Sequence, residues 1–190
     1  YEKQYQSLEM RYASLKEKYT DIEDYSSWQE DTIPANKITL VNNGTHAGPK
    51  TPLVLQTIRY LAQNAENVTI QTPYVICNGY MYDTLNEIAS HAQLKIILNA
   101  VEKGSNPWGC TDYLNQKKKI LETGADVYEL MNDYPVHTKA VLINDRLSVV
   151  GSYNLDMRST YLDTELMLVI DSEKLSQQIH ETESDYMEKS

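Results

Sequence analysis

Residues 135–171 read PVHTKAVLINDRLSVVGSYNLDMRSTYLDTELMLVID, and the rest of the chain is organised around this stretch. Two apolar runs typical of buried strands, 140–143 and 147–150, follow one another closely within it. His137 and Lys139 are separated by one residue, so a strand that began at His137 would place both side chains on one face. The stretch therefore predicts a strand pair with a histidine and a lysine side by side.

Small and polar residues end the second apolar run. Gly151 and Ser152 come directly after it, and Asn154 stands two residues further on. A strand that ends in a small-residue turn with hydroxyl and amide donors suits the recognition of an anion. Together with the histidine and lysine, these residues predict a site for a phosphate group.

The order of polar residues in this stretch resembles the signature of the phospholipase D superfamily, and in particular the C-terminal half of bacterial cardiolipin synthases. The signature runs H-x-K, Gly-Ser-x-Asn, Asp-x-Arg-Ser and then an acidic residue on the next strand. It is matched here by His137, Lys139, Gly151, Ser152, Asn154, Asp156, Arg158, Ser159 and Glu165. One position departs from it, because Asn144 stands where the family usually has Asp. That Asp supports the motif in the family, so the change bears on local salt bridging more than on catalysis.

The resemblance implies a reaction on a phosphodiester through a phosphohistidine, with no cofactor and no metal. In the family, two such motifs from two halves share one active site. One histidine is the nucleophile, and the other protonates the leaving alcohol and then activates the acceptor. The motif here resembles that of the second half, which makes His137 the general acid and base. The nucleophile is then expected on an N-terminal half-domain with a second HKD motif, or on a second copy of the chain.

Five residues are the expected catalytic groups: His137, Lys139, Ser152, Asn154 and Glu165. An unperturbed imidazole titrates at about 6.5, near neutrality. Lys139 would supply positive charge to the phosphoryl oxygens, and Ser152 and Asn154 would supply directed donors. Glu165 is expected to accept from the second ring nitrogen of His137 and to fix its tautomer. The signature's Asp156 and Arg158 are expected to hold the turn together.

Composition and length restrict the alternatives. The chain has 190 residues, enough for a domain with a buried core, and a net charge of −10, which argues against a passive nucleic-acid binder. Its two cysteines, Cys77 and Cys110, are expected to be free thiols, although a disulfide between them stays open. No apolar run reaches the roughly 18 residues of a membrane span. Because the chain starts at Tyr1 rather than Met, we expect a fragment of a longer protein, the fragment itself being soluble. The resemblance implies that the full-length protein belongs to the bacterial cell membrane, at a face that the sequence does not specify.

The first 36 residues predict a helix and a linker, separate from a phospholipase D-like catalytic half-domain at 37–190. Apolar residues recur at spacings of four and three from Tyr1 to Ile22. This spacing predicts an amphipathic helix, which either packs on the protein itself or forms a coiled coil. A polar connection with Pro34 follows over residues 26–36.

From Lys37 the pattern alternates between strands and helices. Strands are expected at 37–41, 68–71, 94–98 and 127–130, with helical patterns between them. Such alternation predicts an α/β sandwich with a mostly parallel mixed sheet and helices on both faces, like that of phospholipase D. Ligands bind such sheets outside the carboxyl ends of the strands, which directs attention to the loops after Val41, Gln71 and Leu98.

The loop after Val41 contains Gly44, Gly48 and Lys50, but its spacing and Pro49 do not fit a phosphate-binding loop. A substrate-lining loop in which Thr51 caps the next helix is preferred, with its histidine, His46, exposed. The loop after Leu98 carries Trp108, which either packs locally or contacts acyl chains or glycerol together with Ile76 and Met81. The lysines 117–119 on the next helix either form a solvated face or approach anionic lipid, and Ser172 is the expected cap of a closing helix.

The leading hypothesis is a phosphatidyltransferase of the phospholipase D type, similar to cardiolipin synthase, that cleaves and transfers phospholipid headgroups such as that of phosphatidylglycerol. The alternatives are a metal-independent phosphodiesterase or nuclease, and a non-catalytic half-domain that serves in interaction. A membrane surface is an expected partner and nucleic acid is not. The isolated chain is expected to be inactive as a monomer.

Overall fold

The computed structural model describes residues 1–21, 23–24, 30, 32–104 and 106–190. The chain divides into two compact units, 1–34 and 35–190. The predicted helix is present in the first unit as α1 (Glu2–Lys18), which buries none of its residues. The last residue of its predicted apolar stripe, Ile22, and part of the predicted connection lie outside the described residues.

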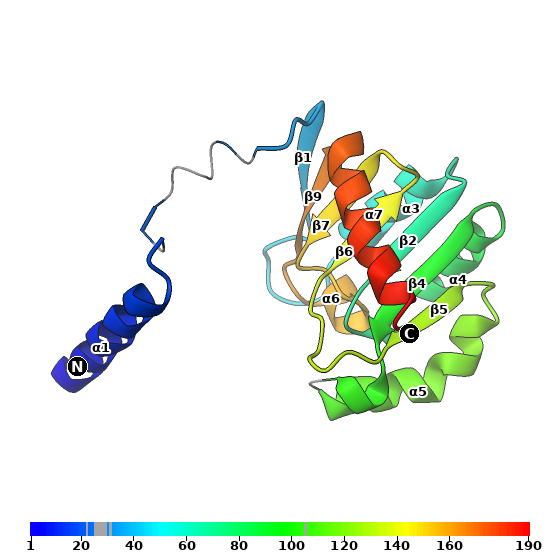
Figure 1. Ribbon diagram of the computed structural model, residues 1–190. Helices are drawn as coiled ribbons and strands as arrows, with labels where there is room; N and C mark the ends of the chain where they lie inside the picture. Colours follow the sequence, from blue (N-terminus) through cyan, green and yellow to red (C-terminus); the bar gives the residue numbers. More distant parts are fainter. Residues whose placement is uncertain (22, 25–29, 31, 105) are drawn as a thin grey trace. The chain divides into compact units, whose positions relative to one another are not determined.

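The second unit is an α/β sandwich built on a seven-stranded mixed sheet (Figure 1). The strand order is β1-β9-β7-β6-β2-β4-β5, and a separate two-stranded sheet pairs β3 with β8. The strands are β1 (Lys37–Asn42), β2 (Asn67–Gln71), β3 (Val75–Ile76), β4 (Gln93–Asn99), β5 (Asp126–Leu130), β6 (Ala140–Ile143), β7 (Leu147–Gly151), β8 (Leu155–Asp156) and β9 (Leu166–Asp171).

The mixed sheet was predicted correctly, but the prediction that it is mostly parallel is wrong for the strand pairings. Only β2–β4 and β4–β5 are parallel, whereas β2–β6, β6–β7, β7–β9 and β1–β9 are antiparallel. The parallel part has helices between its strands. Beyond β5, the tight turn 144–146 reverses the chain between β6 and β7, and a short connection of this kind forces antiparallel pairing.

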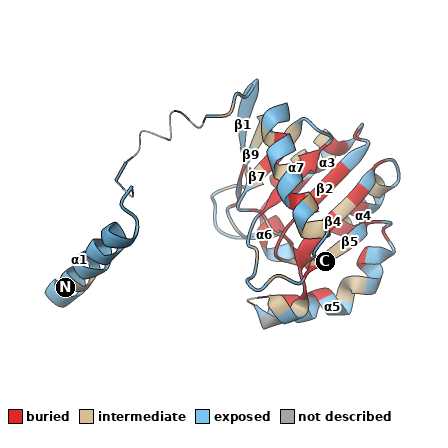
Figure 2. Ribbon diagram, viewed as in Figure 1, coloured by how far each residue is buried: buried red, intermediate tan, exposed pale blue. Residues whose placement is uncertain are grey.

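Helices cover both faces of the sheet, as predicted. The helices are α3 (Leu53–Ala62), α4 (Gly79–Ala89), α5 (Pro107–Leu121), α6 (Met157–Tyr161) and α7 (Glu173–Met187), with a single 3₁₀ turn at Val101–Lys103. The helix α7 crosses one face, over β4 to β7, while α3 and α4 pack on the other. The buried residues concentrate in the central strands and the inner sides of α3 and α4 (Figure 2).

Two helix caps test the expected turn chemistry. The hydroxyl of Ser172 accepts from the amide of Leu175 at 3.3 Å, so the predicted cap of the closing helix is confirmed. The predicted cap at Thr51 is wrong. The helix α3 begins at Leu53 after Pro52, whose side chain has no acceptor. The amide of Val54 in its first turn donates instead to Oδ1 of Asn43 at 3.2 Å.

Candidate active site

His137 and Lys139 form the first part of the site. They lie in the extended segment before β6, which begins at Ala140 rather than at His137 as predicted. The prediction that they face each other is correct. The ammonium of Lys139 lies 2.6 Å from Nδ1 of His137 and donates to the carbonyl oxygen of His137 at 2.8 Å.

The electrostatics of this pair follow from burial. Lys139 is only 9% exposed, and burial lowers its pKa against the opposing attraction of the carboxylates of Glu165 and Asp156. Burial, and next the positive charge of Lys139, lower the pKa of His137 below its ordinary value. The imidazole therefore favours its neutral form at pH 7 when no anion is bound.

Gly151 is required by the closeness of two strands. A Cβ atom at this position would lie 2.1 Å from the carbonyl oxygen of Leu166 and 2.9 Å from Cα of Met167, both in β9. The amide of Gly151 also donates to the carbonyl oxygen of Lys139 at 3.2 Å. The glycine thus lets β7 end tightly between the lysine and the start of β9.

Ser152 and Glu165 form the second part of the site. The hydroxyl of Ser152 donates a very short hydrogen bond to the buried carboxylate of Glu165 and accepts from the amide of Leu166 at 3.0 Å. The prediction that Glu165 accepts from His137 is therefore wrong in this structure, because its hydrogen-bond donor is Ser152. A serine hydroxyl has one proton, so Ser152 positions Glu165 and has none left for a phosphoryl oxygen.

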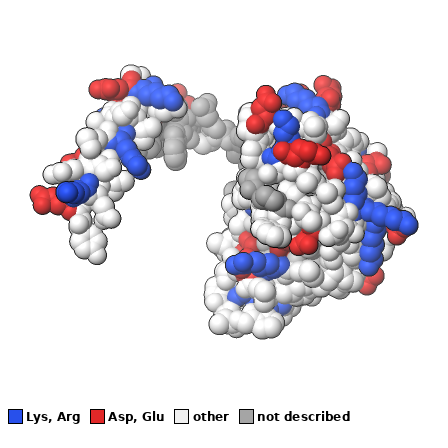
Figure 3. Space-filling model, turned by 90° about the horizontal axis from the view of Figure 1, so that it is seen from below, with Lys and Arg blue, Asp and Glu red and all other residues white. Residues whose placement is uncertain are grey.

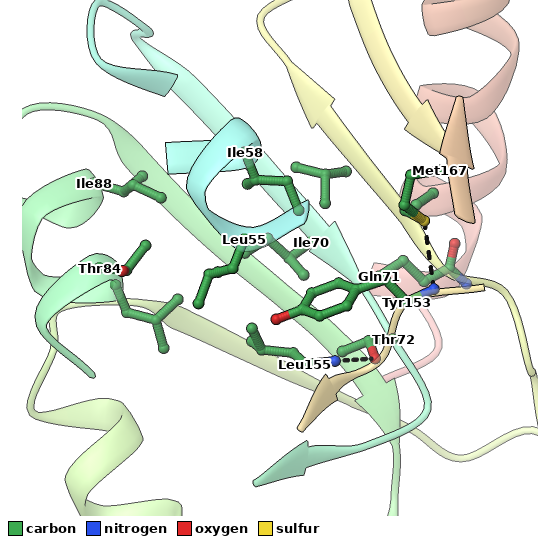
Figure 4. A pocket seen from close by; sticks show the side chains of 13 residues that line it. Leu55, Ile58, Ile70, Gln71, Thr72, Thr84, Ile88, Tyr153, Leu155 and Met167 are labelled. Atoms are coloured by element: carbon green, nitrogen blue, oxygen red, sulfur yellow. Dashed lines mark hydrogen bonds between the residues drawn. The ribbon is translucent and has the colours of Figure 1, made fainter. Parts of the chain in front are cut away.

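Tyr153 anchors this segment in the core. Tyr153 is buried and points into the core (Figure 4). Because side chains alternate along an extended chain, its neighbours are less buried: Ser152 is exposed and Asn154 is half-buried. Its ring lies among the side chains of Leu55 and Ile70, and its amide approaches the sulfur of Met167 at 3.4 Å. Its hydroxyl is 2.8 Å from that of Thr160.

Asn154 presents an amide group with a free end. Its Nδ2 donates to the hydroxyl of Ser159 at 3.3 Å, while Oδ1 is buried with no hydrogen-bond partner among the described residues. Asp156 caps α6 by accepting from the amide of Ser159 at 2.7 Å, and Arg158 pairs with Asp163 at 3.0 Å. The expectation that Asp156 and Arg158 hold the turn agrees with these contacts. The second N–H of the Asn154 amide is left to donate to a ligand, whereas its Oδ1 could only accept.

Two asparagines that the sequence reasoning missed fix the backbone around the site. Asn99, at the end of β4, accepts from the amide of Val136 and donates to its carbonyl oxygen, both at 2.8 Å, and so holds the residue before His137. Asn43, which is fully buried after β1, makes two such bonds. Its side-chain Nδ2 donates to the carbonyl oxygen of Ser159 at 2.9 Å, and its backbone N–H donates to the carbonyl oxygen of Glu165 at 3.0 Å. Both lie at the ends of strands that were expected to face the ligand, and this position in the sequence could have identified them.

Asn144 lies at the opposite end of β6 from the site. It occupies the turn to β7 with φ of 51°, a left-handed conformation that Asn tolerates better than most residues. Its Oδ1 accepts from the amides of Glu66 at 2.9 Å and Asn67 at 3.1 Å. An aspartate oxygen could accept the same two bonds, so the departure from the family pattern leaves the site geometry intact.

The remaining predictions about the loops are partly confirmed and partly wrong. His46 is exposed as expected. The side-chain amine of Lys50 donates to the carbonyl oxygen of His46 at 2.5 Å and so stabilises the loop. Trp108 is 82% exposed, so local packing is wrong for it, and so is the suggestion that Met81 contacts lipid, because Met81 is fully buried. Lysines 117–119 have partners on the protein: Glu129 at 2.6 Å, Glu122 at 3.8 Å and the ring of Tyr82.

Cys77 and Cys110 are buried free thiols, as predicted. Among the described residues, no group of three or more histidine, cysteine or acidic side chains has the arrangement to hold a metal ion. None of the helices in this part of the chain is long and apolar enough to cross a membrane.

The comparisons with known proteins agree with the geometry. The family described as "Cardiolipin synthase, PLD-like domain" matches residues 57–185. Cardiolipin synthase A of Buchnera aphidicola subsp. Schizaphis graminum is 29% identical over 141 residues, which are 72% of this chain and 27% of that protein. The chain thus spans about a quarter of the length of the curated relatives it matches.

Solved structures show the same fold. A phospholipase D family member, Nuc from Salmonella typhimurium, superposes with a TM-score of 0.63 at 15% identity, over 80% of this chain and 96% of that one. Phosphatidylserine synthase of Haemophilus influenzae gives 0.62 at 18% identity, over 77% of this chain and 37% of that one. The family match takes in most of the chain and all five predicted site residues, from His137 to Glu165, and the chain therefore belongs to the family of cardiolipin synthase PLD-like domains.

Proposed function

We propose that this chain supplies one half of the active site of a phosphatidyltransferase similar to cardiolipin synthase. The observation that carries the proposal is the assembly of His137, Lys139, Asn154 and the Ser152–Glu165 pair at one end of the sheet. These groups offer a titratable base, a buried cation and an amide, the set that a phosphodiester reaction needs. The names of the relatives point to a phospholipid as the substrate.

The reaction would proceed in two displacements. A histidine of the partner half attacks phosphorus, the bond from phosphorus to the leaving alcohol breaks, and His137 gives a proton to the leaving oxygen. In the second step His137 takes the proton of the acceptor hydroxyl, its oxygen attacks phosphorus, and the phosphorus–nitrogen bond breaks. One proton and one phosphatidyl group are thus moved without net consumption of either histidine.

The bound substrate would tune His137. In the empty site burial, and next the lysine charge, lower the pKa of His137, which favours the neutral base. A phosphodiester anion beside Lys139 would offset that charge and would give the amine a better acceptor than the imidazole. The pKa of His137 would then rise, which makes the imidazolium available as the proton donor of the first step.

The partner half would come from an N-terminal half-domain with a second HKD motif or from a second copy of this chain. The short span of the chain relative to the curated relatives is compatible with either arrangement. A membrane surface would deliver the lipid, with the site acting on headgroups at the bilayer interface. Sedimentation of the chain beside an activity assay distinguishes the two arrangements, because a second copy predicts activity only in the dimer.

The decisive experiment incubates the chain, together with an N-terminal half-domain if its gene encodes one, with phosphatidylglycerol vesicles and follows lipid products by mass spectrometry. We expect cardiolipin and glycerol to appear, and His137→Gln to abolish both. Tyr60→Ala, an exposed residue of α3, is the control that should change neither. Full turnover by His137→Gln would reject the proposed role of this half. Cleavage of DNA in place of lipid would favour the nuclease alternative, which the net charge of −10 disfavours.

A further inference from the structure

A groove of about 870 Å³ opens between the first turn of α5, the helix α6 and the loop after β2. This volume falls in the range of roughly 300–1,000 Å³ that is usual for small-molecule sites. Its apolar lining includes Tyr74, Ile76, Trp108, Met157 and Leu162. Trp108, Met157 and Leu162 are exposed, and apolar side chains gathered around one hollow indicate a binding site.

The groove is continuous with the candidate active site. Asn154 and Ser159, whose side chains bond to each other, form part of its wall. The ring of Tyr74, another wall residue, meets the ring of His137 edge to face, with 6.3 Å between the ring centres. A molecule whose phosphodiester lies at His137 therefore has a direct path into the groove.

The walls of the groove are held in place by the fold. The side chain of Asn106 caps α5 by accepting from the amides of Trp108 at 3.2 Å and Gly109 at 3.4 Å. A Cβ atom at Gly109 would lie 2.9 Å from the Tyr74 ring, so the backbone of α5 packs directly on that ring. Trp108 thus projects from a fixed turn, and the site is preformed.

The charges around the groove select against a polyanion. Its ionic lining residues are Asp112, Asp156, Arg158 and Asp163, and the only cation among them is paired with Asp163 at 3.0 Å. Seen from below, the second unit carries lysines, arginines and acidic residues spread around its outline, with uncharged surface between them (Figure 3). An occupant with further phosphates would be repelled, whereas an uncharged apolar one would be accepted.

We propose that this groove binds the acyl-glycerol part of the phospholipid whose phosphodiester lies at His137 and Lys139. Trp108 and Met157 are then specificity-determining residues that contact the acyl chains. The inference rests on the proposed function, since it places the substrate's phosphodiester at that site. It adds that the lipid enters along the α5–α6 side of this half.

Two ligands with the same headgroup separate the groove from the phosphate site. Dihexanoylphosphatidylglycerol, used below its micelle concentration, carries acyl chains, whereas glycerophosphoglycerol has none. Titrations followed by ligand-detected NMR give both affinities for the chain. We expect Trp108→Ala and Met157→Ser each to lower the affinity for the acylated ligand roughly tenfold and to leave the affinity for the deacylated ligand unchanged. Tyr60→Ala, which removes an equally exposed aromatic ring outside the groove, should alter neither affinity.

The outcomes distinguish the two proposals. Unchanged affinity of the acylated ligand in both groove variants overturns the groove assignment. Equal loss for both ligands also overturns it, because the groove would then act on the headgroup or on folding, which the unfolding midpoint of each variant reports. Lys139→Ala should weaken both ligands, and if it weakens neither, the proposed function fails rather than the groove.

Discussion

Asn144 stands where the family usually has Asp, and its contribution to the stability of the turn can be tested directly. The residue combines a left-handed backbone with two hydrogen bonds from Oδ1 to the amides of Glu66 and Asn67. Alanine at this position would bear the left-handed strain of about 1 kcal/mol and lose both bonds. Each bond contributes about 0.5–1 kcal/mol net, at the low end of the usual range because the site is exposed. We therefore expect Asn144→Ala to lower the free energy of unfolding by about 2–3 kcal/mol.

Two further variants separate the causes. Asn144→Asp keeps an acceptor oxygen and tolerates the left-handed conformation, so its free energy of unfolding should stay within about 0.5 kcal/mol of the wild type. Asn144→Gly removes the strain but loses both bonds and gains unfolded-state entropy, so it should fall between the other two. Asn144 is five residue steps of extended chain, about 16 Å, from Lys139, so Asn144→Asp should also leave activity unchanged.

The assay is urea unfolding followed by circular dichroism, with the midpoint and slope fitted separately. A change in midpoint at constant slope reports stability alone. If Asn144→Asp proves as destabilising as Asn144→Ala, the carboxylate fails to replace the amide oxygen and the account of this turn is wrong. The same conclusion follows if the alanine variant matches the wild type.

Three other predictions follow from contacts and burial. Gly151→Ala should destabilise the fold by about 1–3 kcal/mol and abolish activity, because the added carbon would meet the Leu166 carbonyl of β9; urea unfolding and the lipid assay check it. The pKa of His137 is lowered in the folded state, so below about pH 6.5 the unfolded state binds more protons than the folded state. The free energy of unfolding should therefore decrease as the pH drops below this value. Unfolding midpoints measured against pH should lose this decrease in His137→Gln. Glu183 of α7 is fully buried, with both carboxylate oxygens unpartnered among the described residues, and burial raises its pKa from 4.5 to about 8. The free energy of unfolding should therefore fall, by a few kcal/mol at most, as the pH rises between these two values. Glu183→Gln should flatten this pH profile, and an unchanged profile would contradict the assignment.

Much of the fold could be predicted from local patterns. Apolar runs of strand length alternate with helical spacing up to β5, and this alternation correctly indicated the sandwich. The pattern could not report strand direction beyond that point, because it does not encode how a three-residue turn such as 144–146 reverses the chain. The sheet of β3 and β8 was also invisible, since strands of two residues have no periodicity.

The site could be predicted by residue type but not by pairing. His137 and Lys139 are separated by one residue, so their contact follows from spacing alone. The contact of Ser152 with Glu165 depends on the register that sets Gly151 opposite Met167, which no local pattern specifies. Asn99 was missed for a related reason, because its partner Val136 lies in a segment without secondary structure.

The backbone of the half-site is held from four strand ends, and this explains which parts of it can respond to a ligand. Asn99 at the end of β4 fixes the segment before His137, and Asn43 after β1 fixes the backbone of Glu165. The end of β7 bonds to Lys139, and Thr72 after β2 accepts from the amide of Leu155 at 3.2 Å. The side-chain amine of Lys139 and the side-chain amide of Asn154 have weaker constraints. Among the described residues, the amine bonds to His137, two positions away, and the amide bonds to Ser159. A phosphodiester would therefore reorient these two groups and leave the backbone unchanged.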